Sequence, residues 1–172
     1  MEAKKATMES VDVKGPVYIR LGRSGVPVIT REETPFRIGR ADVLKDGNDV
    51  AIFACGQMVH EAIAACDSLK KEGINARLIN LHTPKPIDRD AVVKAARETG
   101  AIVTAEEHTV MGGLGSAVAE VVSQEAPVPV KMVGVKDRFG VSGEPAELFG
   151  YFGLTAKDIV KAAKAALALK KR

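Results

Sequence analysis

The stretch DVAIFACGQMVHEAIAACDSLKKEGINARLINL, residues 49–81, contains a strand, a helix and a second strand in succession. Residues 49–56 form a short apolar run closed by a glycine, which is typical of a buried strand. Over residues 57–72 the apolar side chains recur at helical spacing, and lysines followed by Gly73 end that helix. Residues 75–81 are again a short apolar run. This unit with short connections predicts two parallel strands joined by a right-handed crossover.

The same alternation continues to the C-terminus. Two further apolar runs, residues 101–107 and 128–135, predict strands, and a helical pattern follows Leu114. Asp88 is the expected N-cap of one helix, which Gly100 closes. Thr155 and Asp158, three residues apart, have the spacing of a capping box at the start of the last helix. The pattern therefore predicts a parallel sheet with helices on both faces.

An Asp-Gly turn signal interrupts this pattern near its start. The segment KDGN, residues 45–48, lies between two short extended runs within residues 36–50. We expect it to add one antiparallel edge strand through a hairpin. The fold class is thus α/β, a three-layer α/β/α sandwich with a mostly parallel sheet and one antiparallel edge strand, over residues 36–172. Residues 1–35 do not fit the repeat: they indicate the tail of a helix, then a strand at VYIRL, then a polar connection.

Composition excludes several classes of function. Of the 172 residues 46% are hydrophobic but only 4% aromatic, so the core is aliphatic, as in a buried parallel sheet. The net charge of +3 comes from 25 basic and 22 acidic residues, a mixed surface that favours neither nucleic acid nor a membrane. Cys55 and Cys66 match no zinc or CxxC spacing, and the first ten residues lack the apolar run of a signal peptide. We expect a protein of the reducing cytoplasm.

The segment TAEEHTVMGGLGSAVAE, residues 104–120, has the residue types of an active site. Its glycine turn opens a helix, where backbone amides bind anions, but it also allows a strand to meet a helix closely, which is the interpretation we favour. Glu106 and Glu107 are consecutive on a strand and must point to opposite faces, and His108 is expected to hydrogen-bond one of them. No nucleophile is paired with a base, and no Rossmann or Walker fingerprint is present. We therefore assign no catalytic residue and no metal ligand.

Arg20 and Arg23 are the stronger candidates for binding. They lie at the end of the VYIRLGR run, before a flexible Ser-Gly. If the chain turns at Gly22, Arg23 is free to hold a phosphate with its guanidinium fork. An interdomain salt bridge is the alternative role.

At this point the chain, from about residue 5 to its end, resembles the C-terminal end of a transketolase. Four stretches carry this resemblance, and they occur in the family's order. The last of them is similar to the closing segment of the family's C-terminal domain. The four stretches are GPVYIRLGRSGVP (15–27), DVAIFACGQMVHEAIAACDSL (49–69), TAEEHTVMGGLGSAVAE (104–120) and VKDRFGVSGEPAELFGYFGLTAKDIV (135–160).

The resemblance implies transfer of a two-carbon ketol unit between sugar phosphates by thiamine diphosphate and magnesium. The cofactor is implied to bind in domains that this chain lacks, because it has no GDG motif, so a partner N-terminal section would carry it. Residues 1–35 are implied to be the remnant of the end of the pyrimidine-binding domain and a linker, and residues 36–172 the C-terminal domain. Arg23, with Arg20 as its rival, is implied to bind the substrate phosphate. A homodimer is implied, with Glu106, Glu107, His108, Gly112 and Gly113 near the interface.

Three interpretations remain open at this stage. The first is the C-terminal section or subunit of a transketolase, inactive by itself. The second follows from the turn Gly22-Arg23-Ser24, where transketolases often have Ser-Arg-Gln. That departure resembles deoxyxylulose-phosphate synthase and the beta subunits of 2-oxo acid dehydrogenases. The third is a non-catalytic assembly module.

Overall fold

The computed structural model describes residues 1–23 and 25–170, and these fold around one five-stranded sheet. The strands lie in the order β1-β3-β2-β4-β5. All pairs are parallel except β1 with β3, which is antiparallel. The elements are α1 (Glu2–Ser10), β1 (Asp42–Lys45), β2 (Val50–Ala54), α2 (Met58–Lys71), β3 (Ala76–Asn80), α3 (Arg89–Thr99), β4 (Ile102–Thr109), α4 (Leu114–Glu125), β5 (Val130–Val135), α5 (Pro145–Phe152) and α6 (Ala156–Leu169).

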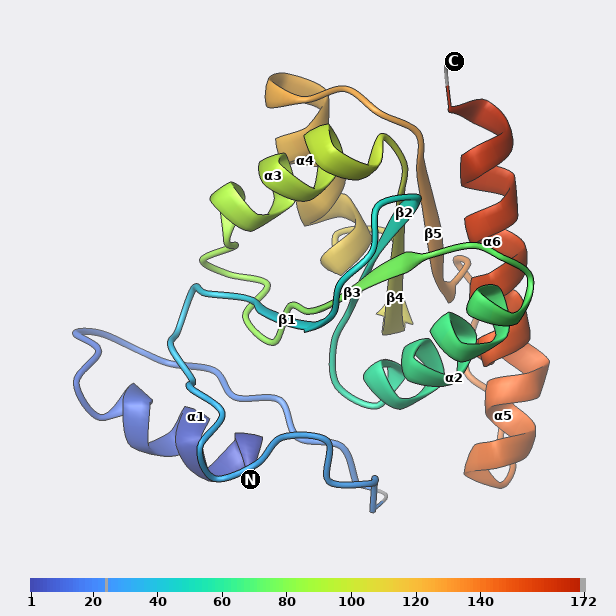
Figure 1. Cartoon of the computed structure of the whole chain (residues 1–172). Helices are drawn as coiled ribbons and strands as arrows, with labels where there is room; N and C mark the ends of the chain where they lie inside the picture. The colour runs from blue at the N-terminus through green and yellow to red at the C-terminus, as the bar shows by residue number, and fades with distance from the viewer. Residues whose placement is uncertain (24, 171–172) are drawn as a thin grey trace.

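Helices cover both faces of the sheet, which confirms the predicted three-layer sandwich (Figure 1). On one face α2 and α6 pack over Val50, Ile52 and Ala54 of β2. On the other face α3 and α4 pack over Ala51 and Phe53 of the same strand. All five residues of β2 are fully buried, which explains why this strand reads as a continuous apolar run.

The helices α3 and α6 begin, and α2 and α3 end, at the capping residues that the sequence predicts. The Asp88 carboxylate accepts the amide of Ala91 at 3.0 Å, and Gly100 closes α3 in the left-handed conformation with φ 66°. Gly73 also has a positive φ, of 79°, after α2. Thr155 and Asp158 form the capping box at the start of α6. Each of these local predictions is confirmed.

The predicted hairpin is wrong, although the antiparallel edge strand exists. β1 pairs with β3, with Asp42 opposite Asn80, and not with β2, which follows it in the chain. Both sides of β2 are already taken by the parallel strands β3 and β4. The turn therefore carries the chain from β1 across the start of β3 to β2. At Gly47 the turn lies so close to β3 that a Cβ atom on Gly47 would be 2.5 Å from the carbonyl carbon of Ala76.

Most of residues 1–35 lie outside the core, although Ile29 packs against it (Figure 1). α1 confirms that helical residues open the chain, but none of them is buried. Thr30 is the one buried residue in the described part of this segment. The strand predicted at VYIRL is not formed: residues 17–21 pair with no strand among the described residues, and Tyr18 is 87% exposed. A strand requires a neighbour, and none of the described residues provides one there. The division at residue 35 stays a prediction.

Candidate functional site: the groove at the carboxyl ends of the strands

The strand order places a crevice at the carboxyl ends of β2 and β4. The chain leaves β2 through α2 toward β3 on one face, and it returns through α3 and α4 on the other face. The winding direction therefore reverses between β2 and β4. In open α/β sheets, ligands bind at this reversal, outside the carboxyl ends of the strands.

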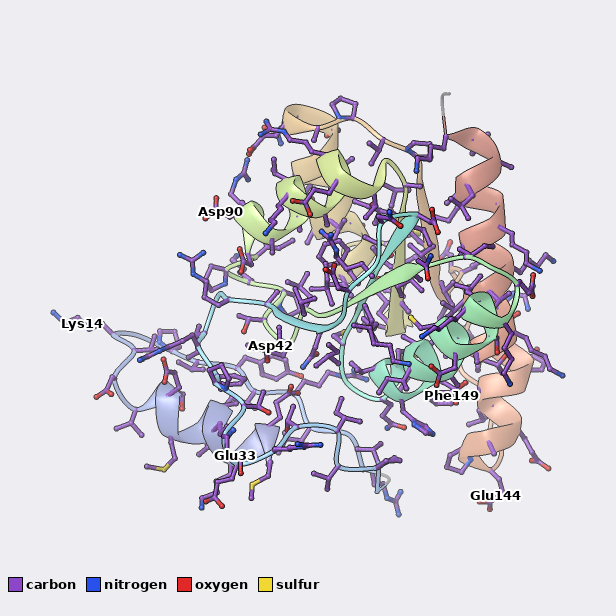
Figure 2. All side chains as sticks on the ribbon, in the orientation of Figure 1. Lys14, Glu33, Asp42, Asp90, Glu144 and Phe149 are labelled. Atoms are coloured by element: carbon purple, nitrogen blue, oxygen red, sulfur yellow. The ribbon has the colours of Figure 1, made fainter. Side chains whose placement is uncertain are left out.

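A groove of about 410 Å³ opens at this place. We call it the carboxyl-end groove. One wall comes from residues 20–23, and the floor from the ends of β4 and β5 and the start of α2. Figure 2 shows Phe149 on the side of α5 that faces α2, with Glu144 at the outer end of that helix. The groove is lined by Arg20, Leu21, Gly22, Arg23, Gln57, Glu107, Val135, Pro145, Leu148, Phe149, Phe152 and Leu154.

The structure brings Arg20 and Arg23 together on this groove. Both side chains are exposed, and neither forms an ion pair within 4.0 Å with a described residue. Between them, Gly22 lies against the side chain of Gln57, whose Nε2 would be 2.8 Å from a Cβ atom at Gly22. Ser24, the next residue of the motif, lies outside the described residues. Two guanidinium groups at a strand-end crevice are suited to binding an anion.

Gln57 was not identified from the sequence as a lining residue. It is the N-cap residue of α2, but its side chain makes no capping hydrogen bond. The signal that points to it is its position directly after Gly56 at the end of a buried strand, where loop residues line a crevice.

Glu106 lies on the opposite side of β4 from the groove, inside the protein. Its side chain is 2% exposed, and its two carboxylate oxygens accept the amides of Leu114 at 2.7 Å and Gly115 at 2.8 Å. Burial raises the pKa of this carboxyl, and the two amides lower it. The backbone amides of the first turn of α4 are therefore already hydrogen-bonded to a carboxylate of the protein itself. The glycine turn allows the end of β4 to approach the start of α4 closely.

Glu107, the next residue, is half-buried and lines the groove, as the alternation along a strand requires. His108 is exposed, and its Nδ1 lies 3.0 Å from the carbonyl oxygen of Thr109. The expected hydrogen bond between His108 and one of the glutamates is therefore not formed. The carboxylate of Glu106 is directed inward. It stays a prediction that a subunit interface lies near Glu107, His108, Gly112 and Gly113.

The other reactive side chains do not form a catalytic pair. Cys55 and Cys66 are free thiols, and burial raises their pKa values to about 12 and about 11. His60 is exposed on α2. The side chain of His82 is 3% exposed, and its ring is stacked on Phe36 at a centroid distance of 4.2 Å. Thiols that stay protonated at neutral pH are poor nucleophiles.

Two other kinds of site were sought in residues 1–23 and 25–170. No three side chains of His, Cys, Asp or Glu gather there in a way that could hold a metal ion. None of the helices within these ranges has the length and apolarity to cross a bilayer.

Comparison with known proteins identifies the family. The family model described as "Transketolase, C-terminal domain" matches residues 39–159. A 6-deoxy-6-sulfo-D-fructose transketolase subunit of Clostridium sp. (strain MSTE9) is 50% identical over 149 residues, which are 87% of this chain and 46% of that protein. An apulose-4-phosphate transketolase subunit of Phocaeicola vulgatus is 42% identical over 163 residues, which are 94% of this chain and 52% of that protein.

A solved structure extends the match to three dimensions. It is titled "Split gene transketolase, inactive beta4 tetramer", and its chain is 52% identical with a TM-score of 0.95, covering 98% of this chain and 55% of that one. This chain thus spans about half the length of these relatives. The match of family model, sequence and fold agrees with the resemblance carried by the four stretches. The chain belongs to the transketolase family, and its five-stranded sheet is the family's C-terminal domain.

Proposed function

We propose that this chain is the C-terminal part of a transketolase, an enzyme that transfers a two-carbon ketol unit between sugar phosphates with thiamine diphosphate and magnesium. Two relatives are named as transketolase subunits, and this chain spans about half of each of them. The rest of the enzyme is supplied by an N-terminal section in the same or a partner chain. The complete enzyme is a homodimer at the least, in the cytoplasm.

The described residues of this chain do not fit the cofactor. The only glycine-rich helix start that followed a strand in the sequence is occupied by Glu106, whose carboxylate would repel a diphosphate. Among the residues described, no carboxylate cluster gathers for magnesium either. In this proposal thiamine diphosphate and its metal bind in the N-terminal section, and no described side chain of this chain takes part in a chemical step. Its role is to bind and orient substrate and to assemble the subunits.

The observation that carries the binding role is the pair of arginines on the carboxyl-end groove. Arg23, or Arg20 as its rival, holds the anion at the end of the sugar that is remote from the reacting carbons. Since neither arginine is engaged in an ion pair with a described residue, each is free to donate hydrogen bonds to phosphate oxygens. The names of the two relatives specify a sulfonated sugar and a phosphorylated sugar, which share a terminal oxyanion.

Reconstitution with the N-terminal section tests this function. We expect ketol transfer from a phosphorylated or sulfonated ketose when both parts, thiamine diphosphate and magnesium are present. By itself the chain is expected to bind no thiamine diphosphate in calorimetry and to show no transfer. Micromolar affinity of the isolated chain for thiamine diphosphate contradicts the proposal. Turnover of a 2-oxo acid, without ketol transfer, identifies a 2-oxo acid dehydrogenase or deoxyxylulose-phosphate synthase instead, and no turnover of either kind favours an assembly module.

A further inference from the structure

The charge of the carboxyl-end groove is small although it holds two arginines. The charged side chains that line it are Arg20, Arg23 and Glu107, which give a formal balance of two positive charges and one negative charge. Glu107 is held on the groove side because its neighbour Glu106 is fixed on the opposite face by the amides of Leu114 and Gly115. The carboxylate is therefore a fixed part of the groove.

Glu107 is not neutralised by the arginines it faces. None of the ion pairs within 4.0 Å among the described residues includes Glu107, Arg20 or Arg23. A ligand anion bound by the guanidinium groups is attracted by two positive charges and repelled by one carboxylate, so Glu107 weakens the attraction without reversing it. The apolar residues Val135, Phe149 and Phe152 line another part of the groove, and interactions between charges are stronger beside apolar atoms than in bulk solvent.

We propose that Glu107 is a specificity-determining residue, which reduces the preference that two arginines give to a doubly charged phosphate and so admits a singly charged terminal group of the sulfonate class. The inference rests on the proposed function, since it assumes that the sugar's terminal anion binds at Arg20 and Arg23. A phosphate ester carries about −1.5 to −2 charges at pH 7, because its second pKa is about 6. A sulfonate keeps a single charge across this range. Each additional negative charge on the ligand is attracted by the two arginines and repelled by Glu107, so the carboxylate reduces the binding free energy that a phosphate gains over a sulfonate.

The test uses the enzyme reconstituted with its N-terminal section and two ketohexoses that differ only in a terminal sulfonate or a terminal phosphate. Glu107→Gln removes the negative charge and keeps the size of the side chain. We expect the ratio of kcat/KM for the sulfonate to kcat/KM for the phosphate to fall by about tenfold, chiefly through a lower KM for the phosphate. Glu120→Gln is the matched control, because Glu120 is exposed on α4 and has no part in the groove, and it should leave the ratio unchanged.

The pH dependence gives a second readout. With the unchanged protein, KM for the phosphate should fall relative to KM for the sulfonate between pH 5.5 and pH 7.5, as the phosphate loses its second proton and gains a charge. In Glu107→Gln this fall should be larger, because the repelling charge is gone. Glu107→Ala serves as a second variant, and thermal unfolding of each reconstituted variant shows whether it is folded.

The outcomes separate this inference from the proposed function. An unchanged ratio in both Glu107 variants overturns the inference, and so does an equal loss for both sugars, which would make Glu107 a contact to the shared carbon skeleton or a structural residue. If Arg20→Ala and Arg23→Ala leave KM unchanged for both sugars, the binding role in the proposed function fails. If KM rises in the arginine variants but the sulfonate-to-phosphate ratio of kcat/KM does not change in the Glu107 variants, only the inference is overturned.

Discussion

Gly113 lies directly over the carboxylate of Glu106, so that a Cβ atom built on Gly113 would be 2.0 Å from Oε2 and 2.6 Å from the carbonyl oxygen of Thr109. Gly113 has an ordinary extended backbone, with φ −94° and ψ −156°, so space and not conformation requires a glycine. The contact joins the buried acid to the start of α4. It makes this corner intolerant of even one added carbon atom.

Gly113→Ala should therefore destabilise the protein much more than Gly112→Ala. The added carbon forces Glu106 from the amides of α4, and overpacking of this kind costs about 1–3 kcal/mol before the lost hydrogen bonds are counted. Gly112 has φ 74° but no atom within 4 Å of a Cβ position, so an alanine there costs only the left-handed conformation, about 1–2 kcal/mol. Urea unfolding of the two variants measures the difference. Equal losses would show that conformation, not space, is the constraint.

Glu106→Gln should lower the free energy of unfolding by about 1.5–3 kcal/mol at pH 7, because an amide offers only one oxygen to the two backbone donors. Burial raises the folded pKa of Glu106 above its ordinary value of 4.5, so the folded protein binds more protons than the unfolded chain between these two values. The stability of the unchanged protein, relative to the variant, should therefore rise as the pH falls from 7 toward 4.5. Unfolding at several pH values checks both statements. A stability difference independent of pH contradicts the second.

His82 should make stability sensitive to acid in the opposite direction. Burial lowers its pKa below 6.5, and the nearby carboxylate of Asp42, 3.8 Å from Nε2, raises it less. A base whose folded pKa is lowered binds fewer protons when folded, so its contribution makes stability fall as the pH drops through 6.5 toward the folded pKa. In His82→Gln this fall between pH 7 and pH 5 should be smaller. Urea unfolding of both proteins at each pH gives the difference between their free energies of unfolding. The contributions of the titratable groups that both proteins share cancel in this difference.

Asp88→Ala should cost about 2–4 kcal/mol, because one carboxylate serves two elements. It caps α3 through the amide of Ala91 at 3.0 Å, and it accepts the amide of Ala41, before β1, at 2.9 Å. Loss of a cap costs about 1 kcal/mol, and an orphaned amide about 1–3 kcal/mol. Asp90→Ala is the control: its carboxylate is 88% exposed, pairs among the described residues with Arg40 alone, and should contribute less than about 1 kcal/mol. Similar losses in both variants would contradict the double role of Asp88.

Arg23→Ala should raise KM for a phosphorylated sugar about ten- to a hundredfold in the reconstituted enzyme. A charge-assisted hydrogen bond to phosphate contributes about 1.5–3 kcal/mol, and it is made in the ground state and the transition state alike, so kcat should fall less. The melting temperature should barely change, because the exposed side chain has no ion pair among the described residues. Arg20→Ala tests the rival. An unchanged KM with a melting temperature several degrees lower would make Arg23 a structural residue.

The sequence predicted those parts of the fold that local patterns control. The four parallel strands and the helices α2, α3, α4 and α6 follow from apolar periodicity, and Asp88, Gly100 and Thr155 mark three of their ends. The partner of β1 could not be read locally, because the Asp-Gly turn favours a hairpin while the free edge of β3 takes the strand. α5 was missed because it is short and is capped by Glu144, although Pro145 and the return contact of Glu147 signal its start.

The site was predictable only in part. Arg20 and Arg23 were named from their turn and from the resemblance, and alternation placed the two glutamates on opposite faces. Which face becomes a groove depends on where the chain after β5 places α5, and that placement has no local sequence signal. For that reason the lining roles of Gln57 and Glu107 emerged only from the structure.

The alternation of side chains along β4 gives the adjacent residues Glu106 and Glu107 different tolerance to substitution. Glu106 and Glu107 are chemically identical, yet one is bound to the framework and the other is open to whatever occupies the groove. Loss or gain of one residue upstream in β4 would exchange them and place both in the wrong environment. Substitution at Glu107, by contrast, disturbs no packed neighbour of α4. The strand therefore places a side chain that holds the framework beside one whose substitution would change only the lining of the groove.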